Sequence, residues 1–377
     1  MKKQILLLLT LLSMAVSNSQ VSVSESYKGR LKKFDTEVFK KFKGTTTVFI
    51  LSNAYDKSAY EALLKSVWTV TPFEVVSPND FDYVNFLTDK YSFAHLRSFC
   101  HKSQSTYDPK TGRHTGGSTF FLTSLIDFYM LDLDKINKKI DKIKNNEEKL
   151  YDLISDNKIE LGAIFLSSNT EMLALANQNF TPGPDFGSVS KSRPYYSAYS
   201  NKLNLMDREL SDYEKKMHAL VYDKNSFKTY SLGYLKNSFQ QINTLIDKEE
   251  FVWVYEEDFK TDEIKNLKNA TLYFPEYIKI KYKPTKFIDE EWDSSELIEI
   301  ISNYNYKNEF ISQDDLDNKI KNDEDFYYLR FTKVNNQKFF QIVNGKTGNV
   351  IYSDYATGLT EYNIKEKDFK KLSKAIL

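Results

Sequence analysis

The chain of 377 residues has 41% hydrophobic and 28% charged residues, which is enough apolar side chain for packed cores and excludes a disordered protein. Its 52 basic residues balance its 52 acidic residues, so there is no overall electrostatic reason to bind nucleic acid or an anionic membrane. The length predicts about two domains, and the single cysteine, Cys100, excludes an intrachain disulfide.

The beginning of the chain has the pattern of a secretory signal peptide. Lys2 and Lys3 precede an apolar run from Ile5 to Val16, and the small residues at 17–19 form a cleavage site. We expect residues 1–19 to direct export to the periplasm or the exterior and to be removed there. No cysteine follows the run, and no later stretch is apolar for long enough to span a bilayer. The sequence therefore predicts a soluble mature chain that has neither a lipid anchor nor a transmembrane segment.

The second half of the chain repeats the first half. The stretch FEVVSPNDFD at 73–82 aligns with NEFISQDDLD at 308–317, and the same offset aligns 58–68 with 293–303. Such self-similarity indicates a duplicated structural unit.

The repeated stretches include the starts of two helices in each copy. Ser58 and Asp293 each precede a glutamate by three residues, which is the pattern of a capping box. Ser77 and Ser312 each precede an aspartate in the same way, and a carboxylate there suits the positive end of the helix dipole. We therefore expect two helices at corresponding places in the two copies.

Each copy is predicted to fold as a β-α-β-α-β-β-β-α module. A helix between the first two strands is a βαβ crossover and requires a parallel pair, whereas the last strands follow through short turns and must be antiparallel. The expected fold class is α/β with mixed sheets, with an N-terminal segment at 20–44, a first module at 45–250 and a second at 268–377. In the second copy we expect strands at 271–276, 307–311, 325–333, 337–344 and 349–354, and helices at 293–303, 313–321 and 365–376.

The first copy carries a long, largely helical insertion at about 134–226, where the second copy has only the turn from Gly345 to Gly348. We expect an amphipathic helix at its start, a return strand at 159–168 and a further helix at 205–223. The stretch 179–202 is rich in proline, glycine and serine, so we expect a loop that contacts a partner. Because a large insertion occupies its position in the other copy, the turn of the second copy is predicted to be a surface hairpin tip.

The order of elements around Lys346-Thr347-Gly348 resembles a known family. There a strand, a TG turn, a second strand and a closing helix follow one another, as in the α/β domain of the curli-secretion-channel (CsgG) and TolB amino-terminal type. The whole chain also resembles uncharacterised exported proteins of Bacteroidota, including a leader that ends in Ser-x-Ser-Gln. These resemblances imply an envelope compartment and carry over no catalytic residue, since a shared frame implies function only by analogy.

Few residues suggest chemistry. His95 and His101 flank Cys100 on a predicted strand, but the spacing is not that of a structural zinc site, and Cys100 and His101 point to opposite faces. The glycine-rich stretch 110–118 lacks a phosphate-loop pattern and is expected to be a hairpin turn. The acidic stretch 287–296 is expected to be a helix N-terminus. We therefore expect no catalytic residue, no metal site and no cofactor.

Arg193, Tyr195, Tyr196 and Tyr199 are the candidate partner contacts, because tyrosines interleaved with serines suit adaptable recognition. Such a loop can also simply cover its own domain. We expect an exported, non-enzymatic envelope protein that binds another envelope protein or a peptide. The alternatives are a hydrolase with its site between the two modules, and an adhesion or stress factor that oligomerises through its sheet edges.

Overall fold

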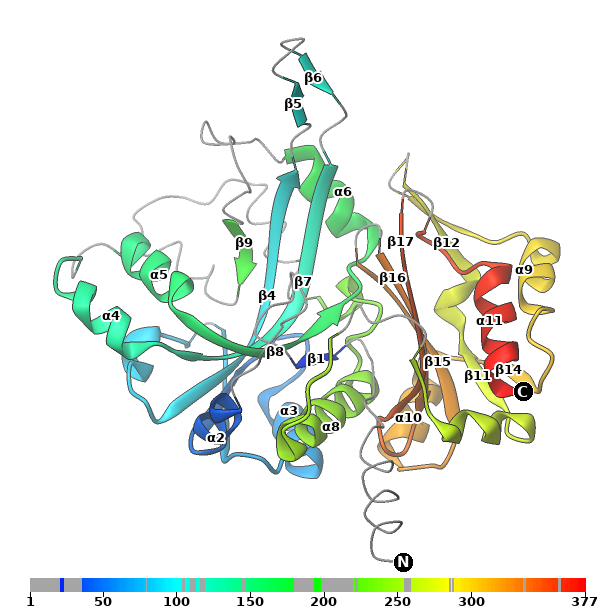
Figure 1. Cartoon of the computed structure of the whole chain (residues 1–377), viewed down its shortest axis with the longest axis horizontal. Helices are drawn as coiled ribbons and strands as arrows, with labels where there is room; N and C mark the ends of the chain where they lie inside the picture. Colours follow the sequence, from blue (N-terminus) through cyan, green and yellow to red (C-terminus); the bar gives the residue numbers. More distant parts are fainter. Residues whose placement is uncertain are drawn as a thin grey trace, which may run out of the picture.

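Two mixed β-sheets lie side by side, with helices against them and between them (Figure 1). The expected leader lies outside the described residues, and no helix within them is long and apolar enough to cross a bilayer. The computed structural model describes residues 21–23, 36–78, 80–103, 106–108, 113–115, 119–143, 147–179, 193–197, 220, 223–253, 259–284, 286, 288–334, 337–358 and 361–377.

The first sheet has the order β1-β8-β7-β4-β2-β3, and β9 pairs with β4 as well. Strand β2 is parallel to β3 and β4, whereas β4, β7 and β8 are antiparallel. Its strands are β1 (Val21–Val23), β2 (Thr46–Ile50), β3 (Phe73–Val76), β4 (Tyr91–Ser103), β7 (Thr119–Leu131), β8 (Lys158–Leu166) and β9 (Arg193–Ser197). The accompanying helices are α2 (Glu37–Lys43), α3 (Lys57–Val67), α4 (Leu133–Ile140), α5 (Glu147–Asp156), α6 (Thr170–Asn179) and α8 (Leu232–Lys248).

The second sheet has the order β10-β17-β16-β15-β11-β14. Its strands are β10 (Phe259–Lys260), β11 (Leu272–Pro275), β14 (Asn308–Ile311), β15 (Tyr327–Val334), β16 (Gln337–Asn344) and β17 (Val350–Thr357). Its helices are α9 (Ser294–Ile301), α10 (Gln313–Lys321) and α11 (Glu366–Ile376). A separate hairpin is formed by β12 (Ile280–Lys283) and β13 (Ile288–Glu291).

The two sheets share one topology. Read from the parallel edge, the orders β3-β2-β4-β7-β8-β1 and β14-β11-β15-β16-β17-β10 match strand for strand. The outer strands β1 and β10 both run antiparallel to their neighbours. The α/β class and the duplicated module are therefore confirmed, and every strand and helix expected in the second copy is present with bounds within three residues.

One helix predicted in the first copy is absent. Ser77 begins no α-helix, and the segment after it forms a single 3-10 turn, η1 (Tyr83–Phe86). Its counterpart α10 does begin at Ser312, whose hydroxyl accepts the N–H of Asp315 at 3.1 Å. In the first copy the fully buried ring of Phe81 packs on the rings of the sheet, and this packing overrides the capping pattern.

The first helix of each module begins at or near its expected cap. Asp293 caps α9 by accepting the N–H groups of Ser295 and Glu296, as predicted. The cap predicted at Ser58 is wrong, because α3 begins after Asp56, two residues earlier. The closing helix of each module, α8 or α11, is present where the sequence predicts it.

The extra residues of the first module lie on either side of the return strand β8. The segment between β7 and β8 forms two helices, α4 and α5, where a single helix was expected. Ile136 and Ile154 bury the apolar sides of these helices against the first sheet. After β8 come α6 and β9, while most of the helix expected at 205–223 lies outside the described residues.

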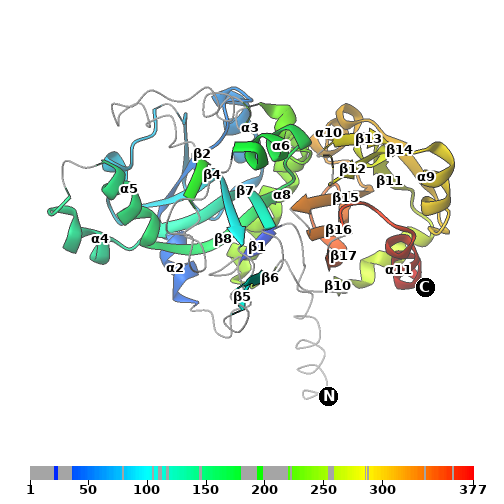
Figure 2. The same ribbon diagram turned by 90° about the horizontal axis from the view of Figure 1, so that it is seen from above.

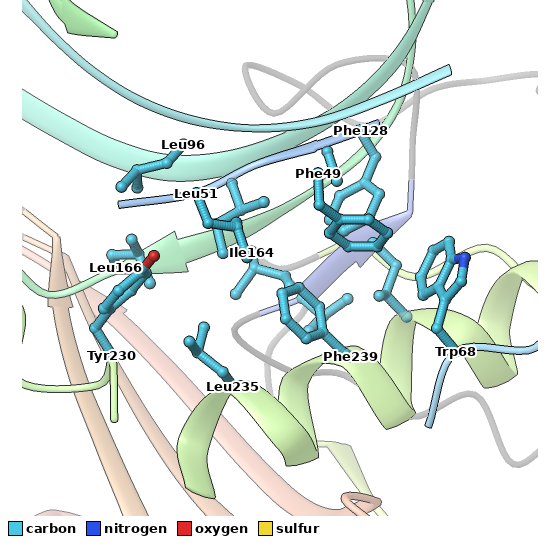
Figure 3. Close-up of a cluster of buried hydrophobic side chains, with 14 of the residues drawn as sticks. Phe49, Leu51, Trp68, Leu96, Phe128, Ile164, Leu166, Tyr230, Leu235 and Phe239 are labelled. Atoms are coloured by element: carbon cyan, nitrogen blue, oxygen red, sulfur yellow. The ribbon is translucent and has the colours of Figure 1, made fainter. Parts of the chain in front are cut away.

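Helix α8 lies between the two sheets (Figures 1 and 2). Leu235 and Phe239 point from α8 toward Phe49 and Ile164 of the first sheet, as Figure 3 shows. Tyr234 instead joins the apolar cluster of the second sheet. A helix buried on two faces joins both modules through one packed layer.

The turn between β16 and β17 lies at the surface only in part. Lys346 and Thr347 are exposed, as the predicted hairpin tip requires, whereas Gly345 and Gly348 are buried and the turn is bonded to α8. The Asn237 amide donates to the Gly345 carbonyl at 2.9 Å, and the Gln240 amide donates to the Lys346 carbonyl at 3.2 Å. Gly348 has φ +72°, and a Cβ there would lie 2.5 Å from the Asn237 carbonyl oxygen. The insertion in the other copy gave no hint of this contact, because it joins elements more than a hundred residues apart.

We expect Gly348→Ala to lower the free energy of unfolding by about 2 kcal/mol, from left-handed backbone strain and the contact with α8. Urea denaturation measures this loss. Gly44→Ala is the control, because Gly44 has φ −81° and its nearest neighbour lies at 3.4 Å. The control is expected to change stability by less than about 0.5 kcal/mol, and equal losses in the two variants would contradict the docked turn.

Candidate functional site

The candidate partner contacts Arg193, Tyr195 and Tyr196 lie in β9, and Tyr199 lies outside the described residues. The loop predicted at 179–202 is therefore wrong for the segment Arg193–Ser197. Strand β9 runs antiparallel to β4, from Arg193 opposite Cys100 to Ser197 opposite Arg97. Strand β2 pairs with β4 only as far as His95. Strand β9 therefore pairs with the backbone groups that β2 leaves unpaired farther along the same edge of β4.

Strands β4 and β7 form a long ribbon that continues past the sheet. They pair from Ser92 opposite Met130 to Ser103 opposite Thr119. The hairpin of β5 (Thr106–Asp108) and β6 (Arg113–Thr115) follows at the far end, standing beyond the sheet in Figure 1. Within the stretch 110–118, where a hairpin turn was expected, residues 113–115 form strand β6 and the glycines lie outside the described residues. In the second module the equivalent strands, β15 and β16, pair over only eight residues each.

A buried polar cluster lies on one face of this ribbon. His95 Nδ1 lies 3.1 Å from the Tyr129 hydroxyl and 3.4 Å from the Tyr83 hydroxyl, and the two hydroxyls are hydrogen-bonded to each other. In the described ranges no three histidine, cysteine, aspartate or glutamate side chains lie close enough together to hold a metal ion. The cluster joins η1 to β4 and β7.

An ion pair extends the cluster toward β8. Arg97 Nη1 donates to Asp127 Oδ2 at 2.7 Å. Lys158 Nζ lies 3.9 Å from the same oxygen and 4.0 Å from the centre of the Tyr129 ring. Burial is the main cause that lowers the pKa of Lys158 and of His95 well below their usual values, and it raises the pKa of Tyr129. Each shift favours the neutral form, so the geometry suits a polar brace of the sheet better than proton transfer.

His95 makes stability depend on pH. Its pKa is lowered in the folded state, so the unfolded chain binds a proton more readily and stability falls as pH drops below about 6.5. Between pH 7.5 and 5.5 we expect the wild type to lose about 1 kcal/mol more than His95→Gln. Urea denaturation at the two pH values measures the difference, and equal losses would show that His95 is not buried as a neutral ring.

A groove of about 680 Å³ lies between α3 and the edge strand β3. Lys57, Glu61 and Lys65 line it from α3, and the segment from Trp68 to Val75 lines it from the other side. The Trp68 ring nitrogen donates to the Thr71 hydroxyl at 2.8 Å, which fixes this wall. The lysines and the two acids that line this open groove, Glu61 and Glu74, give it mixed charge and offer a contact surface.

The junction of the modules, where the alternative hydrolase site was expected, is filled by side chains. Lys236 of α8 donates to the carbonyls of Ile320 and Lys321 and pairs with Asp323 at 2.8 Å. The Ser231 hydroxyl donates to Asp317 Oδ1 at 2.6 Å. Lys236, Asp323, Ser231 and Asp317 are thus engaged in holding the modules together.

The acidic stretch 287–296 is a helix N-terminus only at its end. Ile288–Glu291 form strand β13, which pairs with β12. Glu290 lies 2.6 Å from Lys283 and 3.7 Å from Lys281, so this acid is paired with lysines of the neighbouring strand.

His95 was a candidate from the sequence, whereas Arg97, Asp127 and Lys158 were not predicted. Asp127 interrupts the apolar strand TFFLTSLIDFYML, and a carboxylate within such a run is a signal of a buried ion pair. The groove and the helix between the sheets gave no local signal. The chain matches no known family model, no curated protein and no solved structure.

Proposed function

We propose that this chain is an exported, non-enzymatic component of a cell envelope that binds another envelope protein or a peptide through the elaborated end of its first module. The proposal depends on one observation: the same frame is present twice, and the additions are concentrated in one copy. The first module has the longer β4–β7 ribbon, the β5–β6 hairpin and strand β9, whereas short turns join the corresponding strands of the second module. Specific contacts are commonly carried by additions to a rigid scaffold.

The proposed location rests on the leader at residues 1–19, whose basic start, apolar core and small-residue end are those of a signal peptide. The packed junction favours binding over the alternative hydrolase. A site between modules needs titratable groups that converge on open space, and here Lys236 and Asp317 are bonded across the contact.

The test compares capture of envelope proteins by two variants of the mature chain. In the first, residues 104–118 at the end of the β4–β7 ribbon are replaced by Asn-Gly, which is a tight hairpin turn. In the matched control, Asn336→Gly changes the corresponding turn of the second module. We expect the control to capture the same partner as the wild type and the first variant to lose it. Equal capture by both variants, with both folded by circular dichroism, would contradict the proposal.

A further inference from the structure

Arg330 of β15 is a buried charge whose described partners are all uncharged. Its side chain has 0% exposure. Its Nε and Nη2 donate to Gln341 Oε1 at 3.2 and 3.1 Å, and Nη2 lies 3.5 Å from Gln241 Oε1. Among the described residues no carboxylate pairs with it. A guanidinium stays protonated, and a buried charge without a counter-charge costs several kcal/mol.

Comparison of the two modules shows that Arg330 lacks the acidic partner of its counterpart. Arg97 occupies the matching place in the first module, within FAHLRSF against FYYLRFT of the second. His95 lies two residues before Arg97 on β4 and is opposite Asp127 of β7. Asp127 pairs with Arg97 at 2.7 Å. In the second module, Tyr328 lies two residues before Arg330 on β15 and is opposite Val343 of β16. The second module therefore keeps the arginine and lacks the carboxylate.

Three buried hydrogen-bond donors remain at this junction without an acceptor in the described part of the chain. They are Arg330 Nη1, Gln241 Nε2 and the Tyr234 hydroxyl. The Tyr234 hydroxyl has the Tyr277 hydroxyl as a neighbour, but the two do not form a well-aligned hydrogen bond. Tyr234 and Gln241 lie two turns apart on α8, and Gln241 reaches the Arg330 guanidinium through its oxygen. Donors together with one positive charge suit an anion, because each unmet donor in a buried site costs free energy.

We propose that Arg330, Gln241 and Tyr234 bind a small monovalent inorganic anion, of the chloride class, where α8 meets the second sheet. A water molecule would accept hydrogen bonds there but would leave the charge uncompensated. The side chains of Tyr234, Tyr328 and Val343 are fully buried, so bulk solvent does not reach this charge. Because protein interiors are close-packed, a single-atom ion is the counter-charge that such a site would accept most readily. The buried acid of the junction, Asp317, is bonded to Ser231 and Gln313 instead.

The anion thus supplies the counter-charge of Arg330 in the second module, as Asp127 supplies that of Arg97 in the first. It neutralises the arginine and helps α8 to dock on the second sheet. Since only the folded chain forms the site, the anion is expected to stabilise the protein by linkage.

Crystals of the mature chain grown in sodium bromide test the site directly. We expect one anomalous peak within hydrogen-bond distance of Arg330 Nη1. Water density, or no density, at that place would overturn the proposal.

Thermal unfolding supplies a second test that does not depend on crystals. The midpoint is expected to rise with sodium chloride but not with sodium gluconate at equal ionic strength. Val343→Asp places a carboxylate where the first module has one, and should remove this chloride dependence, while the matched Val343→Asn should retain it. Equal midpoints in the two salts, or the same chloride dependence in both variants, would overturn the proposal. If Val343→Asp does not fold, the bromide peak and the comparison of salts still decide the matter.

Discussion

Replacing Lys338 by methionine is expected to lower the free energy of unfolding by about 3–5 kcal/mol at pH 7. Lys338 Nζ lies 2.6 Å from Asp368 Oδ2, and the two side chains are 1% and 0% exposed. Asp368 also accepts the N–H of Lys365 at 2.8 Å, at the start of α11. Burial raises the pKa of Asp368 even beside the lysine, so the carboxylate is already costly to keep ionised. Without Lys338 it would be buried and unpaired.

The loss of unfolding free energy caused by Lys338→Met is expected to be smaller at lower pH. In the variant the folded pKa of Asp368 lies still further above its unfolded value, so protonation favours the folded state and the loss shrinks as pH falls from 7 to 5. Urea denaturation at both pH values measures this. The double variant Lys338→Met with Asp368→Leu leaves no unpaired charge and should recover most of the loss. A loss below about 1 kcal/mol in the single variant would show that the pair is not the anchor of α11.

Phe239→Ala is expected to cost about 3–5 kcal/mol, because a large ring is removed from a site that cannot collapse. Phe239 has 0% exposure and meets the Phe49 ring edge-on, with 5.5 Å between ring centres. It lies on the face of α8 that covers the first sheet, as Figure 3 shows. Urea denaturation of residues 20–377 measures the loss.

The neighbouring position on α8 provides the control. Gln240 is partly exposed and makes a single bond to the turn of the second module, at 3.2 Å to the Lys346 carbonyl. Gln240→Ala is therefore expected to cost less than about 1 kcal/mol. Comparable losses from the two substitutions would mean that α8 is not the packed centre of the molecule.

The elements that the sequence predicts well are those with strong local patterns. Strand β16 was expected at 337–344 and is found there, because a run of β-forming residues is followed directly by a turn that contains two glycines. Strands β1 and β10 were not predicted. They are three and two residues long, too short for any alternation, and β1 pairs with β8 about 140 residues away.

The remaining errors have long-range causes as well. The capping pattern at Ser77 is as good as that at Ser312, but only the second begins a helix, because Phe81 is drawn into the first sheet. Strand β9 forms because β4 is longer than β2, which no local pattern in 179–202 reveals. Similarly, Arg97 and Asp127 are thirty residues apart, and only the register of β4 and β7 brings them together.

Because α8 packs on both sheets, the two like modules are expected to unfold as one cooperative unit. Native-state hydrogen exchange of residues 20–377, followed over a series of low urea concentrations, tests this, because it measures the opening free energy of each strand in the same molecule. Amides of β7 in the first sheet and of β16 in the second should exchange with one opening free energy and one urea dependence. Amides of β16 that open at a lower free energy and with a smaller urea dependence than those of β7 would show that the two modules open separately.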